Sequence, residues 1–150
     1  IDQQNDSLAA AIFTIDAAGT DFKFTRYMSG ALVYTVDGKI PTEGALLVVA
    51  PSFNTIPAAG QKKYAEDRIK TLPRGEKTVI KEINDISIDH MKGYEIIADG
   101  LSKSGAPALV YQAMLFDETG QYYVISGEAA AAPGKYLITF RKIAQTFKRK

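Results

Sequence analysis

The stretch that decides the fold lies close to the carboxyl end, where residues 136–148 read YLITFRKIAQTFK. Its large apolar side chains recur at the three- and four-residue spacing of one helix face: Tyr136, Phe140, Ile143 and Phe147. Pro133 precedes them and suits a first helical turn, where its missing N–H loses no hydrogen bond. The pattern predicts a helix over residues 133–148 whose apolar face packs against a flat layer.

The segments before this helix predict that layer. Residues 108–116 are apolar on both faces and broken only by Gln112, a pattern typical of a strand in the centre of a sheet. A turn at residues 117–120 leads back into a strand at residues 121–126, and a short loop at residues 100–105 precedes the central strand. Connections this short join antiparallel neighbours, because a parallel return needs about a dozen residues.

Further strands are predicted on both sides of a second helix. Strand patterns occur at residues 22–27, 31–36, 45–50, 79–83, 85–89 and 93–99. Asp37-Gly38 is a hairpin signal, and a change in the phase of the isoleucines predicts a turn or bulge near Asn84 and Asp85. Residues 8–18 fit a helix or a strand equally well.

The second helix is predicted over residues 61–72, where Ala65, Ile69 and Leu72 share one face and Pro73 stops the pattern. The chain of 150 residues is 46% hydrophobic and 23% charged, close to the averages of globular domains. We therefore expect a single α+β domain over residues 1–150, with an antiparallel sheet of six or seven strands covered by helices.

Composition excludes several classes of function. Eighteen Lys and Arg against 17 Asp and Glu give a net charge of +1, which argues against a nucleic-acid partner. The absence of cysteine removes thiol catalysis, disulfides and cysteine-ligated metals. No apolar run reaches the roughly 20 residues of a membrane span. The chain starts at Ile1 without a methionine, so we expect a processed or an artificially trimmed chain, and a lipid anchor before Ile1 stays an open alternative.

The one histidine, His90, is the strongest candidate for catalysis. Asp89 is adjacent, but neighbouring strand residues point to opposite faces, and Lys92-Gly93 indicates a solvated turn instead. We expect no enzyme, with His90-dependent hydrolysis as the minor alternative. The acidic pair Asp117-Glu118 lacks the spacing of a calcium loop, and no phosphate-binding loop is present, so neither a metal nor a cofactor is expected.

Aromatic residues are in surplus, with eight Tyr, seven Phe and no Trp. Tyr122 and Tyr123 must project to opposite faces of one strand, with Tyr111 on the neighbouring strand. One interpretation is a partner-binding surface formed by Tyr111, Tyr122, Tyr123 and His90, since tyrosine is enriched at interface hot spots. The other is that most of these rings are core, with the hydroxyl at the rim.

The order of elements resembles a known family. A helix ending at Leu72, the strand, turn and strand at residues 86–95, the hairpin at residues 111–124 and the closing helix at residues 136–148 are similar to the PsbP-like α/β/α sandwich. The resemblance covers residues 61–148. It implies a non-enzymatic accessory or protein-binding domain, secreted or periplasmic, with no catalytic motif to transfer. The alternative is a carrier of a small apolar ligand, with a pocket between sheet and helix lined by strand aromatics.

Overall fold

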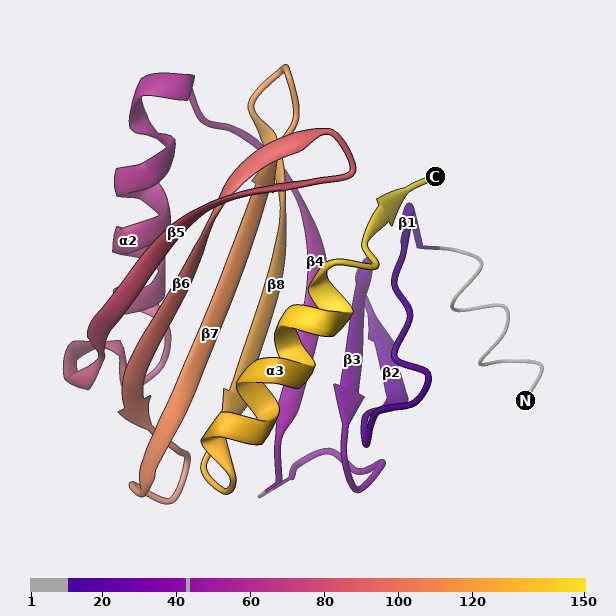
Figure 1. Cartoon of the computed structure of the whole chain (residues 1–150), viewed down its shortest axis with the longest axis vertical. Helices are drawn as coiled ribbons and strands as arrows, with labels where there is room; N and C mark the ends of the chain where they lie inside the picture. Colours follow the sequence, from indigo (N-terminus) through magenta and orange to yellow (C-terminus); the bar gives the residue numbers. More distant parts are fainter. Residues whose placement is uncertain (1–10, 43) are drawn as a thin grey trace.

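The computed structural model describes residues 11–42 and 44–150 of the chain. In these residues the main feature is a seven-stranded antiparallel sheet, which Figure 1 shows as a broad twisted layer. Its strands are β2 (Lys23–Met28), β3 (Ala31–Thr35), β4 (Leu46–Thr55), β5 (Val79–Ile88), β6 (Met91–Leu101), β7 (Pro107–Phe116) and β8 (Gln121–Ala129). Their spatial order is β2-β3-β4-β8-β7-β6-β5, which confirms the antiparallel prediction.

Helices lie on both faces of this sheet. Helix α3 (Pro133–Ala144) crosses one face and α2 (Gln61–Thr71) lies on the other, as Figure 1 shows. Two 3-10 turns, η1 (Ala58–Gly60) and η2 (Gly75–Lys77), flank α2, and short β1 (Phe13–Thr14) pairs with β9 (Lys148–Arg149). None of the helices in the described residues is both long and apolar enough to cross a bilayer.

The core beneath α3 follows from the predicted apolar stripe. Phe140 and Ile143 are fully buried, and Tyr136 packs at the edge of the same cluster. Gly127 of β8 lets the helix come close, because a Cβ at that position would lie only 2.7 Å from an atom of the Phe140 ring. The stripe therefore packs against the sheet as the sequence predicts.

A polar network also joins α3 to the sheet. The guanidinium of Arg141 donates from Nε and Nη2 to the two carboxylate oxygens of Glu95, each at 3.1 Å. Tyr111 donates its hydroxyl hydrogen to the same carboxylate at 2.9 Å, and Asn84 donates from its amide at 3.0 Å. Because Glu95 is buried, these donors supply the partners that its charge requires.

Helix α2 packs over one part of the other face. Its buried Ala65 and Ile69 contact side chains of β6, β7 and β8, among them Ile96, Met114 and Val124. From β7, the buried amide of Gln112 donates to the backbone oxygen of Ala65 at 2.9 Å. Strands β2, β3 and β4 contribute no buried residue to the core under α2, so this part of the face is left to other chain segments.

Several boundaries differ from the predictions, and β4 and β8, for example, run on to Thr55 and Ala129. The last helix ends at Ala144 instead of Lys148, because the chain leaves the helix to pair Lys148–Arg149 with β1. Residues 79–88 form one strand, and its bulge lies between Ile80 and Glu82, not at Asn84 and Asp85. The isoleucine phase changes because successive isoleucines serve the two different cores of the sandwich.

The segment left open at residues 8–18 contains the short strand β1 in its described part, and residues 8–10 lie outside the described residues. Strand β7 lies between β8 and β6, inside the sheet, as its two apolar faces predict.

Candidate functional site

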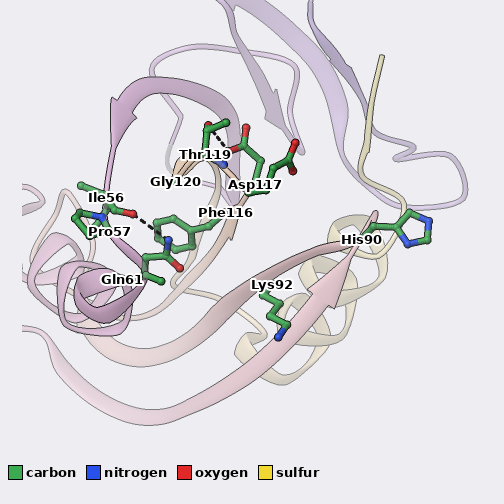
Figure 2. Close-up of a pocket in the computed structure, with 11 residues that line it drawn as sticks. Ile56, Pro57, Gln61, His90, Lys92, Phe116, Asp117, Thr119 and Gly120 are labelled. Carbon is green, nitrogen blue, oxygen red and sulfur yellow. Dashed lines mark hydrogen bonds between the residues drawn. The ribbon is translucent and has the colours of Figure 1, made fainter.

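A hollow of about 510 Å³ lies at the end of the sheet where three chain segments meet. Its lining comes from the segment before α2 (residues 56–58 and Gln61), the β5–β6 turn and its strand (His90 and Lys92), and the β7–β8 turn (residues 116–120). Figure 2 shows these residues, and we refer to the hollow as the turn-end trough. Its lining contains both apolar and polar side chains, and it is open to solvent.

The segment before α2 is fixed to the β7–β8 turn by a close backbone approach. The N–H of Ile56 donates to the oxygen of Gly120 at 3.0 Å. Gly120 has φ +89°, and a Cβ there would lie 2.6 Å from the Ile56 oxygen, so only glycine fits. Gln61 then donates from Nε2 to that same oxygen at 3.0 Å (Figure 2). These contacts give the trough one fixed wall.

Asp117 builds the opposite turn. Its Oδ1 accepts hydrogen bonds from the backbone and the hydroxyl of Thr119, at 2.8 and 2.6 Å, and from the backbone of Gln121 at 3.1 Å. Burial alone would raise the pKa of Asp117, but these bonds and the nearby Arg149 charge outweigh it and lower the pKa. The carboxylate is thus ionised and occupied in closing the hairpin.

His90 lies in the β5–β6 turn, as the sequence predicts, and it is exposed. Asp89 and His90 have φ values of +52° and +62°, a left-handed conformation that non-glycine residues rarely adopt. In Figure 2 the imidazole points away from the other labelled side chains. Within the described residues, His90 forms no side-chain hydrogen bond, so no neighbour orients it for proton transfer.

Asp89 is held by the other end of the chain. The backbone N–H and Nε of Arg149 donate to its Oδ2 at 2.8 and 3.2 Å, and Nη2 donates to its backbone oxygen at 3.0 Å. The backbone hydrogen bond from Arg149, above the effect of the guanidinium charge, lowers the pKa of Asp89. The carboxylate beside His90 therefore anchors β9 and does not form a catalytic pair with the imidazole.

The predicted surface of Tyr111, Tyr122, Tyr123 and His90 does not assemble. Tyr111 and Tyr122 retain 1% and 5% of their exposure, and they are buried in the two different cores. Tyr123 faces the α3 side, where it packs on Phe147. Strand alternation places Tyr122 and Tyr123 on opposite faces of the sheet, and it also places Tyr111 and Tyr122 on opposite faces. Of the four residues, only His90 is exposed.

Buried tyrosine hydroxyls are satisfied inside the fold. Burial beside the Glu95 carboxylate raises the pKa of Tyr111 far above its usual range. The hydroxyl of Tyr122 pairs with that of Tyr64 at 2.7 Å, which joins β8 to α2. The interpretation of these rings as core therefore describes Tyr111 and Tyr122, but the hydroxyl of Tyr111 bonds the buried Glu95 and does not lie at the rim.

A second hollow of about 400 Å³ lies on the part of the sheet that α2 leaves uncovered. Aliphatic side chains of β3 and β4 form its floor: Ala31, Val33, Leu46 and Val48. The connection from β3 to β4 forms one wall with Ile40 and Pro41, and Arg74, Lys103 and Glu128 lie at the other side. We call it the β3–β4 groove; it shares no lining residue with the turn-end trough.

The β3–β4 groove lies at a different place from the predicted apolar pocket. The expectation was a pocket between sheet and helix lined by strand aromatics. The hollow at the carboxyl end of α2 has no aromatic side chain among the described residues that line it and holds about 220 Å³, whereas a hollow of about 520 Å³ at the start of α2 is lined by Gln61 and Tyr94, among others. The β3–β4 groove lies between the sheet and the β3–β4 connection. The sequence did contain a signal for an uncovered part of the sheet, because it predicts six or seven strands and only two helices. A helix about 10 Å wide covers only two or three strands spaced about 4.8 Å apart.

Among the residues that the structure describes, no three His, Asp or Glu side chains lie close enough together to hold a metal ion.

No protein-family model matches the sequence, and no curated protein matches it. Solved structures do. The yeast (Saccharomyces cerevisiae) Ran-binding protein Mog1p superposes with a TM-score of 0.60 at 10% identity, over 86% of each chain. LpqN of Mycobacterium tuberculosis, described as involved in cell envelope biogenesis, gives 0.59 at 15% identity, over 93% of this chain and 84% of that one.

The PsbP protein of the cyanobacterium Synechocystis sp. PCC 6803 gives a TM-score of 0.56 at 13% identity, over 93% of this chain and 94% of its own. At such identities the likeness concerns the fold. The chain thus has the PsbP-like α/β/α sandwich fold, and the predicted resemblance in fold is confirmed.

Proposed function

We propose that this chain is a non-enzymatic, extracytoplasmic domain that recognises a protein partner at the turn-end trough. The observation that carries the proposal is the meeting of three separate chain segments around one open hollow of mixed polarity. Protein interfaces are about as apolar as the rest of a protein surface, whereas small-molecule pockets are mostly apolar. The lining of the turn-end trough has the mixed polarity of a protein interface.

The charges around the trough support the same function. Lys92 and Glu118 are both exposed there, and they offer opposite charges to a partner. Such an arrangement selects a partner by complementary charge more than by bulk affinity. His90 contributes an exposed ring held in a strained turn, and strained backbone is often retained where a side chain has to be presented.

Proteins of the same fold agree with this class of role. Mog1p is described as a Ran-binding protein, and LpqN is described as involved in cell envelope biogenesis. The first supports recognition of a protein, and the second supports a place outside the cytoplasm. The occupied carboxylates of Asp89 and Asp117 support a role without catalysis.

Capture from an extract of the source cells tests the proposal. The purified chain should retain a specific protein, and the double variant His90→Ala/Lys92→Glu should lose it. Lys142→Glu makes the same charge change on exposed α3, on the opposite face, and should retain the protein. Retention by the trough variant would contradict the site. Hydrolysis of an ester panel that disappears in His90→Ala would contradict the absence of catalysis.

A second candidate function is the carriage of a small apolar ligand. The β3–β4 groove favours it, because its volume of about 400 Å³ lies in the range of small-molecule sites and its floor is aliphatic. Native mass spectrometry of the freshly purified chain should then show an added mass that denaturation releases. A single unliganded species, also after incubation with lipid extract, would reject the carrier function.

A further inference from the structure

We propose that the β3–β4 groove binds a single-chain amphiphile with an anionic head group, its apolar tail on the floor and its head between Arg74 and Lys103. The inference deepens the second candidate function, carriage of an apolar ligand, and is independent of the turn-end trough. It names the chemical class of the ligand and the residues that select it.

The floor of the groove suits an alkyl chain. Val33, Leu46 and Val48 lie on the face opposite α3, where strand alternation places apolar groups that α2 does not cover. The backbones of β3 and β4 are paired on both sides, to β2 and to β8, so the floor has no free backbone donors or acceptors. A bound peptide backbone would leave its polar groups unsatisfied there, whereas an alkyl chain has none to satisfy.

The far side of the groove is cationic. Among the described residues that line the groove, the charged ones are Arg74, Lys103 and Glu128, which leaves an excess of one positive charge in this set. The pair between Arg74 Nη2 and Glu128 Oε1 is long, at 3.5 Å, compared with about 2.7–2.9 Å for a strong charge-assisted bond. Glu128 therefore neutralises Arg74 only in part.

Arg74 is held in place to receive an anion. It has φ +66° between α2 and η2, and its Nε donates to the backbone oxygen of Leu101 at 3.1 Å. Within the described residues its Nη1 has no hydrogen-bond partner, and Lys103 forms no ion pair. A guanidinium fork with unused donors beside a free ammonium is the arrangement that carboxylates and phosphates prefer.

Together the two sides select for a molecule with one apolar end and one anionic end. A cationic head would meet net repulsion, and a neutral head would leave the guanidinium without a charged partner. Small-molecule sites commonly combine a mostly apolar lining with a few polar groups that fix the orientation of the ligand. The β3–β4 groove has this composition.

Three probes with the same tail test the head-group assignment: decanoate, decanol and decyltrimethylammonium, each below its micelle concentration. Titrations of the whole chain are followed by amide chemical shifts. Decanoate should shift the amides of Val33 and Val48 and bind at least about tenfold more tightly than the other two, the affinity ratio of one modest polar interaction.

Variants distinguish the contribution of the head group to binding from that of the tail. Lys103→Gln in the exposed hairpin, and Arg74→Gln, should each weaken decanoate severalfold and leave decanol unchanged. Val48→Asn should weaken all three probes, because it places an uncharged polar group on the floor, and Lys142→Gln on α3 should weaken none. Because Arg74 also holds Leu101, Lys103→Gln remains informative should Arg74→Gln unfold the chain.

The outcomes also separate this inference from the carrier function. Equal binding of the three probes in the groove would overturn the anionic class and leave the carrier function standing. Shifts confined to other parts of the chain, or no binding by any probe, would overturn both.

Discussion

At the scale of single residues, the β5–β6 turn shows strain with an identifiable support. Asp89 and His90 both adopt left-handed backbone conformations, which cost roughly 1–2 kcal/mol per non-glycine residue. Arg149 compensates at Asp89, since it binds both the side chain and the backbone oxygen. His90 has no comparable contact within the described residues, so its strain is offset elsewhere in the fold.

Relief of this strain should therefore stabilise the protein. We expect His90→Gly to raise the free energy of unfolding by about 1 kcal/mol, because glycine accepts positive φ without a steric cost. His90→Ala keeps the Cβ and the strain, and should stay within about 0.5 kcal/mol of the wild type. Urea denaturation of the three proteins measures the difference. Equal stability of the glycine and alanine variants would show that position 90 is not strained.

Glu95 is the residue whose charge depends most on its neighbours. Burial would raise its pKa, but hydrogen bonds from Arg141, Asn84 and Tyr111, together with the Arg141 charge, lower the pKa below its ordinary value of 4.5. A carboxyl with a lowered pKa in the folded state stabilises the fold above its unfolded pKa. That stability is lost as the pH falls through the folded pKa.

Removal of Arg141 should consequently destabilise the protein in a pH-dependent way. Arg141→Ala leaves a buried carboxylate with fewer donors, which we expect to cost roughly 1–3 kcal/mol at neutral pH. The loss is moderate because the Arg141 side chain is 42% exposed and partly screened by solvent. The difference from wild type should shrink as the pH falls through the pKa of Glu95, because protonation removes the charge that Arg141 pairs with.

Guanidinium denaturation at neutral pH and at acid pH measures the effect of Arg141→Ala. Lys142→Ala, the exposed neighbour on the same helix, is the matched control and should show little change at either pH. A loss in Arg141→Ala that does not vary with pH would mean that packing of the arginine stem, and not its charge, joins α3 to Glu95.

At the scale of elements, the closing helix and the short tail after it act as one unit. Phe147 lies three residues beyond the end of α3, yet it is 1% exposed and stacks on Phe13 at 5.4 Å between ring centroids. The pairing of β9 with β1 brings these two rings together. The apolar stripe therefore continues past the helix, because the sheet face that it covers is wider than the helix is long.

Truncation of this ring should be as costly as a core mutation. We expect Phe147→Ala to lower the free energy of unfolding by about 3–5 kcal/mol. Ile138→Ala, on the same element but 71% exposed, should change it by no more than about 0.5 kcal/mol. Thermal and urea unfolding of both variants measure the contrast. A small effect at Phe147 would show that the tail is not part of the core.

At the scale of the whole molecule, the two faces of the sheet are covered unequally. The buried strand residues of the cluster under α3 come from β1 and from β3 to β8, whereas those of the cluster under α2 come from β6, β7 and β8, with the partly buried Ile80 and Ile83 of β5 packed against them. The part of that face over β3 and β4 is therefore left for the β3–β4 groove. Unequal coverage gives different local stabilities within one sheet, since fewer buried contacts mean easier local opening.

Hydrogen exchange should reveal this asymmetry. Strands β3 and β7 each have a neighbouring strand on both sides. Neither is an edge strand, so a difference in their exchange rates reflects how well α2 covers each of them. We expect β7 amides to exchange at least about tenfold more slowly than those of β3. Addition of decanoate should slow β3 if the groove binds it. Equal rates in β3 and β7 without ligand would show that the sheet opens only as a unit.

Much of the fold follows from local pattern alone. The spacing of Tyr136, Phe140 and Ile143 determines a helix with one apolar face, and short turns such as residues 117–120 determine antiparallel neighbours. Both signals are local, because periodicity and loop length constrain a chain without knowledge of distant residues. The PsbP-like arrangement was expected from a family resemblance in the order of the elements, and the likeness to solved structures confirms that fold.

The candidate sites depend on contacts between distant segments, and so only the tertiary structure decided them. Local pattern placed His90 in a turn, but not beside residues 56–58, and it could not bring Arg74 next to Lys103 over the floor of β3 and β4. Local pattern also left open whether Tyr111 and Tyr122 are surface or core residues. Strand alternation shows that neighbouring residues point to opposite faces of the sheet, but it does not show which element covers each face. Coverage is a property of packed layers, and no short window of sequence contains it.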